Sequence, residues 1–395
     1  MAPAPGNPLH AELPKSPPDL VQDSAAESRI VDGGFGESPA PTVSVLIPVY
    51  NGAETVSEAV QSIRKQEFPF LEILLINDGS RDASAKVLSS LLGSDSRVRV
   101  LTNDRNMGLS WTLNRGLHEC RGDLVLVLHQ DCALCAPNWI SSAVPSFADP
   151  RVISVVGSPR HDVEKMDRLE RIFWIVRHHV TTAPSDSVGG TKLSLFSENK
   201  CDLFRREPIL SLGGFDGRLR EGGEDQVLAW KLSRTEYHVV HRDDLPFAVS
   251  LGKSASLSSH LRKDQSYGRQ MRQVLLITRF GAIRRSSEGS VDVRLTNRAT
   301  GVAWILASLA VIVLALVLRN WTALLFAFVP PFLRGVQLAV RGLRQQRAYG
   351  LRRTDVARIA LWGLLADLSY AIGMVTPGRG ATAAHSGLKS SPSVP

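Results

Sequence analysis

The pattern between positions 43 and 128 alternates between short apolar runs and longer segments of helical composition. An apolar run without polar alternation is typical of a strand that is covered on both faces. Strands that alternate with helices build βαβ units around a mostly parallel sheet. The predicted strands are Val43–Ile47, Leu71–Ile76, Val98–Leu101 and Leu124–Leu128, and the predicted helices are Ala53–Gln66, Asp82–Leu92 and Leu109–Cys120. The sequence therefore predicts an α/β protein with a Rossmann-like core.

Ligands of such sheets bind beyond the carboxyl ends of the strands, so the polar residues there are candidate site residues. They are Tyr50-Asn51, Asn77–Ser80, Asn103–Gly108 and His129–Asp131. Asp78 could hydrogen-bond a base or ribose, and Asp131 could hold a divalent cation against a diphosphate. Gly79 would let the backbone approach a ligand, and Ser80 would cap the next helix. Taken alone, each aspartate is more typical of a turn former or a helix cap than of a ligand-binding residue.

The charge of the chain is concentrated near its C-terminus. The net charge is +8, and residues 334–395 hold nine basic residues against two acidic ones, a net charge of +7. A basic protein can bind nucleic acid or an anionic membrane. The first 333 residues are nearly neutral and show no Lys/Arg stripe interleaved with aromatics, which argues against a nucleic-acid partner.

The last third of the chain is apolar enough to enter a membrane. Val302–Leu318 has no charged residue and reaches the lower length limit for a bilayer span. Trp321–Leu333 follows and contains Pro330-Pro331, which would kink or end it unless the segment continues towards Val340. Val356–Val375 contains Arg358 and Asp367, so it either spans or lies in the interface. We expect two or three transmembrane helices within residues 300–375.

The two ends of the chain are predicted to be disordered. Residues 1–40 are rich in Pro, Ala, Ser and acids and have no apolar run, which predicts a disordered segment without a signal peptide. Residues 376–395 are predicted to be a disordered tail.

Cys132 and Cys135 form a CxxC pair without a second pair or a thioredoxin-like context, and the four cysteines are expected to be reduced, buried thiols.

Five blocks in residues 43–235 together resemble the family 2 glycosyltransferases. The first four are similar to the nucleotide-sugar half of that family, and the fifth is similar to its acceptor half. They are Val43–Asn51, Leu74–Asp82, Asn103–Gly116, Gly122–Asp131, and Gly213–Asp216 with Gly223–Asp225. The resemblance implies a GT-A fold over residues 41–285, a nucleotide-sugar donor and inversion at the anomeric carbon.

The resemblance also implies roles for individual residues. The expected donor-binding residues are Pro48, Tyr50, Glu54, Asp78, Gly79, Ser80 and Gly108. Asp131 would bind the metal that bridges the diphosphate, and Asp225 would be the general base, with Glu224 as the alternative base. Without the resemblance, the segment around Glu224 and Asp225 would be interpreted as a solvated turn that caps the following helix.

Two departures from the family pattern affect these expectations. The metal motif of the family is Asp-x-Asp, whereas His129 occupies the first position here; histidine suits Mn²⁺ better than Mg²⁺. Later histidines that could act as ligands are His241 and His260. Processive members have a Gln-x-x-Arg-Trp block after the base, and residues 239–285 have none. We therefore expect the transfer of one or a few sugars.

The leading hypothesis is a membrane-anchored, metal-dependent glycosyltransferase that uses a UDP- or GDP-linked sugar. Its catalytic domain would face the cytosol, and its acceptor would be a lipid-linked sugar or another membrane-proximal glycan. The alternatives are a polyprenyl-phosphate glycosyltransferase and a non-catalytic scaffold that binds nucleotide sugars. With two spans, the Arg-rich segment after the second span returns to the cytosol, as the positive-inside rule requires.

Overall fold

The computed structural model describes residues 41–69, 72–160, 166–177, 191–194, 197, 199–220, 222–250, 256–279 and 293–376. Side chains are not described for 191–194 and 293–299. The disorder predicted for residues 1–40 and, apart from Thr376, for residues 376–395 lies outside these ranges.

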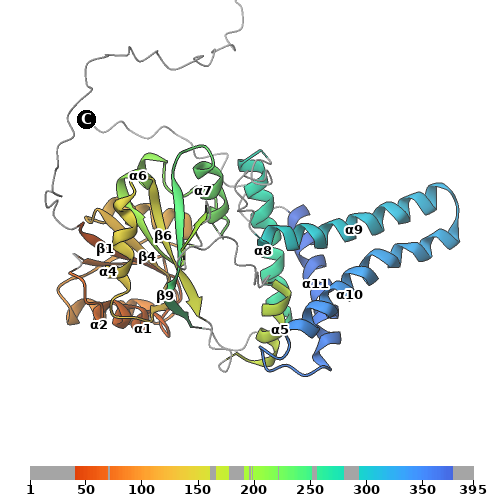
Figure 1. Cartoon of the computed structure of the whole chain (residues 1–395), viewed down its shortest axis with the longest axis horizontal. Coiled ribbons are helices and arrows are strands. Elements are labelled where there is room, and N and C mark those ends of the chain that lie inside the picture. The colour runs from red at the N-terminus through yellow and green to blue at the C-terminus, as the bar shows by residue number, and fades with distance from the viewer. Residues whose placement is uncertain are drawn as a thin grey trace, which may run out of the picture. The chain divides into compact units, whose positions relative to one another are not determined.

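The described strands form one mixed sheet in the order β3-β2-β1-β4-β8-β6-β9-β5, with β7 beside β9 (Figure 1). The strands are β1 Val43–Val49, β2 Glu72–Asn77, β3 Val98–Thr102, β4 Leu124–Leu128, β5 Cys132–Leu134, β6 Val152–Arg160, β7 Thr191–Ser194, β8 Cys201–Arg205 and β9 His238–Val249. The first four strands are parallel, and β6 is parallel to β9. The antiparallel pairs all involve β5, β7 or β8. The prediction of a mostly parallel sheet is confirmed.

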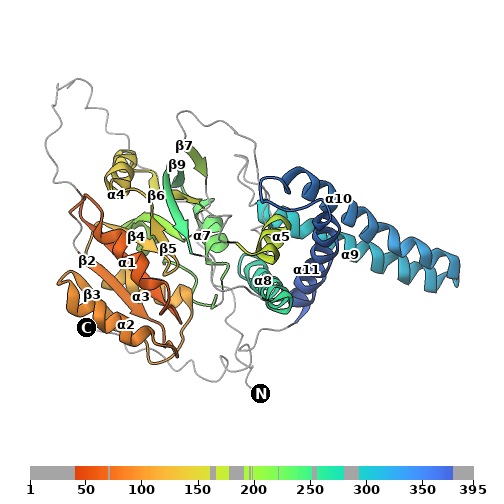
Figure 2. The same ribbon diagram turned by 90° about the horizontal axis from the view of Figure 1, so that it is seen from below.

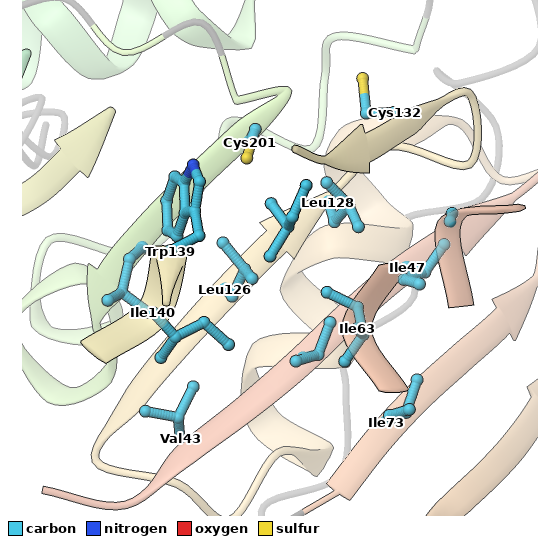
Figure 3. Close-up of a cluster of buried hydrophobic side chains, with 14 of the residues drawn as sticks. Val43, Ile47, Ile63, Ile73, Leu126, Leu128, Cys132, Trp139, Ile140 and Cys201 are labelled. Carbon is cyan, nitrogen blue, oxygen red and sulfur yellow. The ribbon is translucent and has the colours of Figure 1, made fainter. Parts of the chain in front are cut away.

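Apolar side chains fill both faces of this sheet, which explains the uninterrupted runs. Because successive side chains of a strand point to opposite faces, Ile47 of β1 lies in one core with Ile63 and Trp139 (Figure 3). Its neighbour Leu46 lies in a second core with Leu113 of the opposite face. Both β1 residues are fully buried. A buried side chain of this kind stabilises the fold by about 1.5–3 kcal/mol.

Helices cover both faces of the sheet and continue beyond it. They are α1 Val56–Arg64, α2 Ser84–Ser94, α3 Leu109–Glu119, α4 Trp139–Ala143, α5 Arg168–Arg177, α6 Arg206–Ser211, α7 Glu224–Leu232, α8 Leu257–Ile277, α9 Val293–Val317, α10 Val329–Gln345 and α11 Asp355–Val375. Two 3₁₀ helices, η1 Val144–Ala148 and η3 Trp321–Phe328, precede β6 and α10.

Three helical segments in the described part of the C-terminal region are long and apolar enough to cross a membrane. They are Thr300–Val317, Trp321–Gln345 and Asp355–Val375. In the second segment, α10 begins at Val329 directly after η3, and Pro330 and Pro331 are its second and third residues. Proline is tolerated at the first helical positions, because the backbone N–H groups there have no partner inside the helix. The two prolines therefore do not end the segment.

Three of the four cysteines are buried, and all four are free. Cys132 and Cys201 lie together in the first core (Figure 3). Burial raises the pKa of both thiols. Cys135 is exposed, so the expectation that all four thiols are buried is wrong for this residue. It lies just beyond the short strand β5, at the sheet edge, where the core no longer covers the chain.

Candidate active site

The loops after β1, β2 and β4 are held together by side-chain hydrogen bonds to the backbone. The Gln130 amide donates to the carbonyl of Tyr50 over 3.1 Å and accepts from its N–H over 2.9 Å. Ser80 Oγ accepts from the N–H of Asn51 over 3.0 Å. The sequence therefore correctly placed Tyr50, Ser80 and the His129–Asp131 segment at one edge of the sheet. Tyr50 is 42% exposed there, whereas Pro48 is buried within β1.

Ser80 does not cap a helix, in contrast to the expectation from the sequence. Helix α2 begins later, at Ser84, and its N-cap residue Ala83 makes no side-chain cap. Asp82 accepts instead from the N–H of Ser84 over 3.0 Å and from the N–H of Ala53 over 3.1 Å. These hydrogen bonds lower the pKa of Asp82, although partial burial opposes them as the largest single effect. The exposed Glu54 follows Ala53 on the same loop.

Asp78 is buried, and its carboxylate holds the loop that follows β3. Oδ1 accepts from Asn103 Nδ2 over 2.7 Å and from the N–H of Met107 over 2.8 Å. Oδ2 accepts from the N–H of Gly108 over 3.0 Å. In this structure the carboxylate that the resemblance assigns to the nucleoside therefore orders residues 103–108.

Two glycines allow backbone segments to approach closely at this edge. Gly79 has φ +64°, and a Cβ there would lie 2.5 Å from the carbonyl carbon of Arg105. Gly108 has φ +94°, and a Cβ would lie 2.8 Å from the carbonyl oxygen of Arg220. Gly79 thus accommodates the 103–108 loop, in addition to any ligand expected from the sequence. Arg220 also donates to the carbonyl of Asn106 over 2.8 Å, which joins this loop to the segment before α7.

The segment from His129 to Cys132 forms a tight turn after β4. The N–H of Cys132 donates to the carbonyl of His129 over 2.9 Å. Asp131 is half-buried, and its carbonyl accepts from the N–H of Ser250. The N–H of His129 donates to the carbonyl of Lys200 over 2.8 Å, so the turn is fixed from the acceptor half of the sheet.

Glu224 and Asp225 are the first two residues of α7. The N-cap is Gly223, with φ +92° and no side-chain cap, and Asp225 Oδ1 accepts from the N–H of Gln226 over 2.8 Å in the first turn. Asp225 therefore makes the helix-end contact that the turn interpretation expects. Asp225 is half-buried, whereas Glu224 is buried with Oε2 lacking a hydrogen-bond partner among the described residues. Burial raises the pKa of Glu224, against the lowering effects of its own N–H and of Asn199.

A buried polar cluster that the sequence analysis missed lies beside Glu224. Asp202 on β8 is fully buried between Val127 of β4 and Val156 of β6. Its carboxylate accepts from Ser197 Oγ and, over 2.7 Å, from the N–H of Asn199. An acid inside the apolar run Cys201–Phe204 was the signal for this cluster, since a buried carboxylate needs hydrogen-bond donors.

Residues 44–209 match the family model described as "Glycosyl transferase family 2". The chain therefore contains a domain of the glycosyltransferase family 2 type in this region. The matched residues include the donor-side loops and the cluster at Asp202, and they end before Glu224 and Asp225.

Individual relatives of this glycosyltransferase domain are distant. An uncharacterised protein, MT1568, of Mycobacterium tuberculosis is 29% identical over 185 residues, which are 44% of this chain and 57% of the relative. An undecaprenyl-phosphate 4-deoxy-4-formamido-L-arabinose transferase of Pseudomonas fluorescens is 38% identical over 97 residues, 24% of this chain and 28% of the relative. The chain therefore spans between 28% and 57% of the length of these two curated relatives.

A solved structure supports the fold of the glycosyltransferase. The mannosyltransferase PcManGT from Pyrobaculum calidifontis, in complex with GDP-Man and Mn²⁺, superposes with a TM-score of 0.53 at 18% identity. The superposition covers 84% of this chain and 88% of that chain. The fold is therefore of the GT-A type, as the sequence predicted.

The candidate site for a divalent cation is the turn that contains Asp131. No group of three or more His, Cys, Asp or Glu side chains converges anywhere in the described ranges. His241 lies on β9. His260 lies on α8, stacked on Phe173 with ring centroids 4.3 Å apart and bonded to Arg177. Burial and Arg177 lower its pKa to about 4. The donor set that fits a divalent cation is thus one carboxylate, Asp131, with His129 two residues before it. This suits an ion whose remaining ligands come from a diphosphate and water.

Proposed function

We propose that the protein is a membrane-anchored, inverting glycosyltransferase that moves one or a few sugars from a UDP- or GDP-linked donor to a lipid-linked or glycan acceptor. The observation that carries this proposal is the link between the donor and acceptor halves. The N–H of His129 donates to the carbonyl of Lys200 over 2.8 Å, and the neighbouring Asn199 lies close enough to the buried Glu224 to affect its pKa. The candidate metal residue Asp131 and the candidate base Asp225 each adjoin this link in sequence.

The half-buried Asp225 is the candidate general base. A carboxylate on the face opposite the leaving group would accept the proton of the acceptor hydroxyl as the new glycosidic bond forms. Glu224 is less suited to this role, since it is buried and burial disfavours its charged form. Glu224 would instead be a buried residue of the first turn of α7, beside Asn199.

On the donor side, Tyr50, the Gly79-Ser80 turn and the 103–108 loop would enclose the nucleotide. Asp131 would hold a divalent cation, Mg²⁺ or Mn²⁺, with His129 as a further ligand for Mn²⁺. When bound, the cation would neutralise charge on the departing diphosphate. The exposed ring of Tyr50 offers an apolar surface for a base, and the backbone hydrogen bonds of Gln130 fix its position.

The candidate membrane spans support an acceptor at the membrane. We propose a multi-pass protein of the cell membrane whose catalytic domain is cytoplasmic, where nucleotide sugars are made. The transferase from Pseudomonas fluorescens acts on undecaprenyl phosphate according to its name, and this relative supports polyprenyl phosphate as a second candidate acceptor. A phosphate acceptor is already ionised, so transfer to it would depend less on Asp225.

A donor screen on the purified protein in lipid nanodiscs would test the proposal. Release of UDP or GDP would be measured with a panel of nucleotide sugars and with lipid extracts as the acceptor source. The Asp225→Asn variant should lose about 10²–10⁴-fold in turnover, the usual contribution of a general base. A chelator should abolish turnover, and added Mn²⁺ or Mg²⁺ should restore it.

The matched controls are Asp243→Asn, the same change at an exposed position of β9, and Glu224→Gln. Asp243→Asn should behave as the parent, and Glu224→Gln should retain far more turnover than Asp225→Asn. Full activity of Asp225→Asn with a polyprenyl-phosphate acceptor would favour the second candidate. Binding of nucleotide sugars without turnover by the parent would refute both and point to a scaffold.

A further inference from the structure

Helix α11 packs along one side against two polar helices of the catalytic part of the chain. At its beginning, Asp355 pairs with Arg168 of α5, with 2.6 Å between Nη2 and Oδ1. Further along, Trp362 stacks on Phe173 of α5 with ring centroids 6.2 Å apart. At its end, Tyr370 shares an apolar cluster with Met271 of α8. α5 and α8 therefore accompany α11 over nearly its whole length.

The backbones of α8 and α11 contact each other directly at two glycines. A Cβ on Gly268 of α8 would lie 2.0 Å from the carbonyl oxygen of Tyr370, and a Cβ on Gly373 of α11 would lie 2.0 Å from the carbonyl oxygen of Gln265. Only glycine fits at two such positions. The two helices are thus in direct backbone contact, so a change in the depth of one in a membrane requires the same change in the other.

Helix α8 cannot enter the hydrocarbon of a bilayer. Its exposed face includes the charged side chains Arg262, Lys263 and Arg272. A charged side chain in the centre of a bilayer is strongly unfavourable. If α11 crossed the membrane, α8 would have to follow it into the bilayer with these charges. Helix α11 must therefore stay at a depth where α8 remains in water or among headgroups.

The remaining faces of α11 suit a position at the membrane surface. One face contacts α10, where Arg334 pairs with Asp367 over 2.8 Å and Gly363 packs on Leu338. In both views α11 lies across the α9–α10 pair instead of along it (Figures 1 and 2). A third face is an exposed apolar stripe of residues spaced three, four or seven apart. This stripe consists of Leu361, Leu368, Ile372 and Val375.

We propose that α11 is an in-plane helix of the membrane surface and not a third span. The chain then crosses the membrane twice, through α9 and through η3 with α10, and Thr376 lies on the same side as the catalytic domain. The apolar stripe of α11 contacts the acyl chains, and exposed arginines next to the helix contact anionic lipid headgroups. These arginines, in the last turn of α10 and the connection to α11, are Arg344, Arg347, Arg352 and Arg353. A helix with one lipid-facing apolar stripe and flanking cations is typical of an interfacial helix.

Accessibility labelling with a membrane-impermeant maleimide tests the topology directly. The native Cys135 is exposed on the catalytic domain and reports which side that domain occupies. In a Cys135→Ser background, Thr376→Cys should label from the same side as Cys135, and Arg319→Cys, between the two spans, should label from the opposite side. Labelling of Thr376→Cys together with Arg319→Cys would show that α11 spans and would overturn the proposal. Labelling of Arg319→Cys on the side of Cys135 would overturn it as well.

Depth measurements provide a second test that does not depend on sidedness or on catalytic activity. A fluorophore is placed on single cysteines at the exposed positions 361, 368 and 372 in vesicles with lipid-attached quenchers at different depths. An in-plane helix places all three at one depth, whereas a span spreads them over about 16 Å, given a rise of about 1.5 Å per residue. A spread of depths of that size would refute the in-plane position.

Discussion

Replacement of Asp78 by asparagine would show whether its carboxylate orders the 103–108 loop or is reserved for the donor. The variant keeps the size of the side chain and exchanges one oxygen for an NH₂ group. Both carboxylate oxygens accept from donors, Asn103 Nδ2 and the N–H groups of Met107 and Gly108. Either orientation of the amide therefore places a donor against a donor. A hydrogen bond to a charged group contributes about 1.5–3 kcal/mol, and a buried unsatisfied donor costs about 1–3 kcal/mol. We expect a loss of about 2–4 kcal/mol.

The assay is thermal unfolding of the purified protein in detergent, followed by donor KM. For a domain of this size, about 1 kcal/mol lowers Tm by about 2–4 °C, so Asp78→Asn should lower it by about 4–16 °C. The matched control is Asp104→Asn, the same change at an exposed position of the same loop, which should leave Tm unchanged. A normal Tm for Asp78→Asn combined with a raised KM would refute the loop-ordering role and favour a direct contact with the nucleoside.

Three further predictions follow from the same structure. Gly108→Ala should lower Tm and activity together, because its φ of +94° disfavours an L side chain and a Cβ would clash with the backbone of Arg220; an unchanged Tm would contradict this close approach. Burial raises the pKa of Glu224 in the folded protein above about 4.3, the pKa of a glutamate in an unfolded chain. The parent should therefore lose stability as the pH rises from about 4.3 through the pKa of the folded protein. In a series of Tm measurements at different pH, Glu224→Gln should lack this loss. Asp367→Asn should destabilise the α10–α11 contact by about 3–5 kcal/mol, because it leaves Arg334 buried without its anion. The double variant Arg334→Met with Asp367→Leu should lower Tm less than Asp367→Asn does, because it leaves no buried charge.

The strands and loops of the donor half were predictable because they depend on local patterns. The strands of the parallel core are short and mostly apolar, and neighbouring side chains such as Leu46 and Ile47 enter opposite cores. The positions of the loop residues could be predicted from the sequence, but their hydrogen-bond partners could not. Nothing in the sequence shows that Ser80 bonds Asn51, or that Asp78 accepts from residues 25 to 30 positions away.

The acceptor half was less predictable, because its contacts join segments distant in sequence. Strand β8 pairs antiparallel with both β4 and β6, which no run of residues 158–211 indicates. Asp202 is identifiable as important only once β8 is known to be central and buried. Helix α8 has a mixed polar sequence without a family block, and other strands or helices lie along the chain between it and each of its partners, α5, α7 and α11.

Helix α8 connects the candidate base to the membrane region. The two glycines before α7 pack directly on it: a Cβ on Gly222 would lie 2.7 Å from Gln270 Oε1, and a Cβ on Gly223 would lie 2.7 Å from a methyl group of Val274. One turn away, Gly268 of the same helix touches Tyr370 of α11. The start of α7, with Asp225, is therefore separated from α11 by the thickness of a single helix. If α11 lies in the membrane surface, a hydroxyl that Asp225 deprotonates must be presented within about 10–12 Å of that surface, the diameter of a helix with its side chains. An acceptor attached to a lipid meets this condition, whereas a sugar far from the membrane does not.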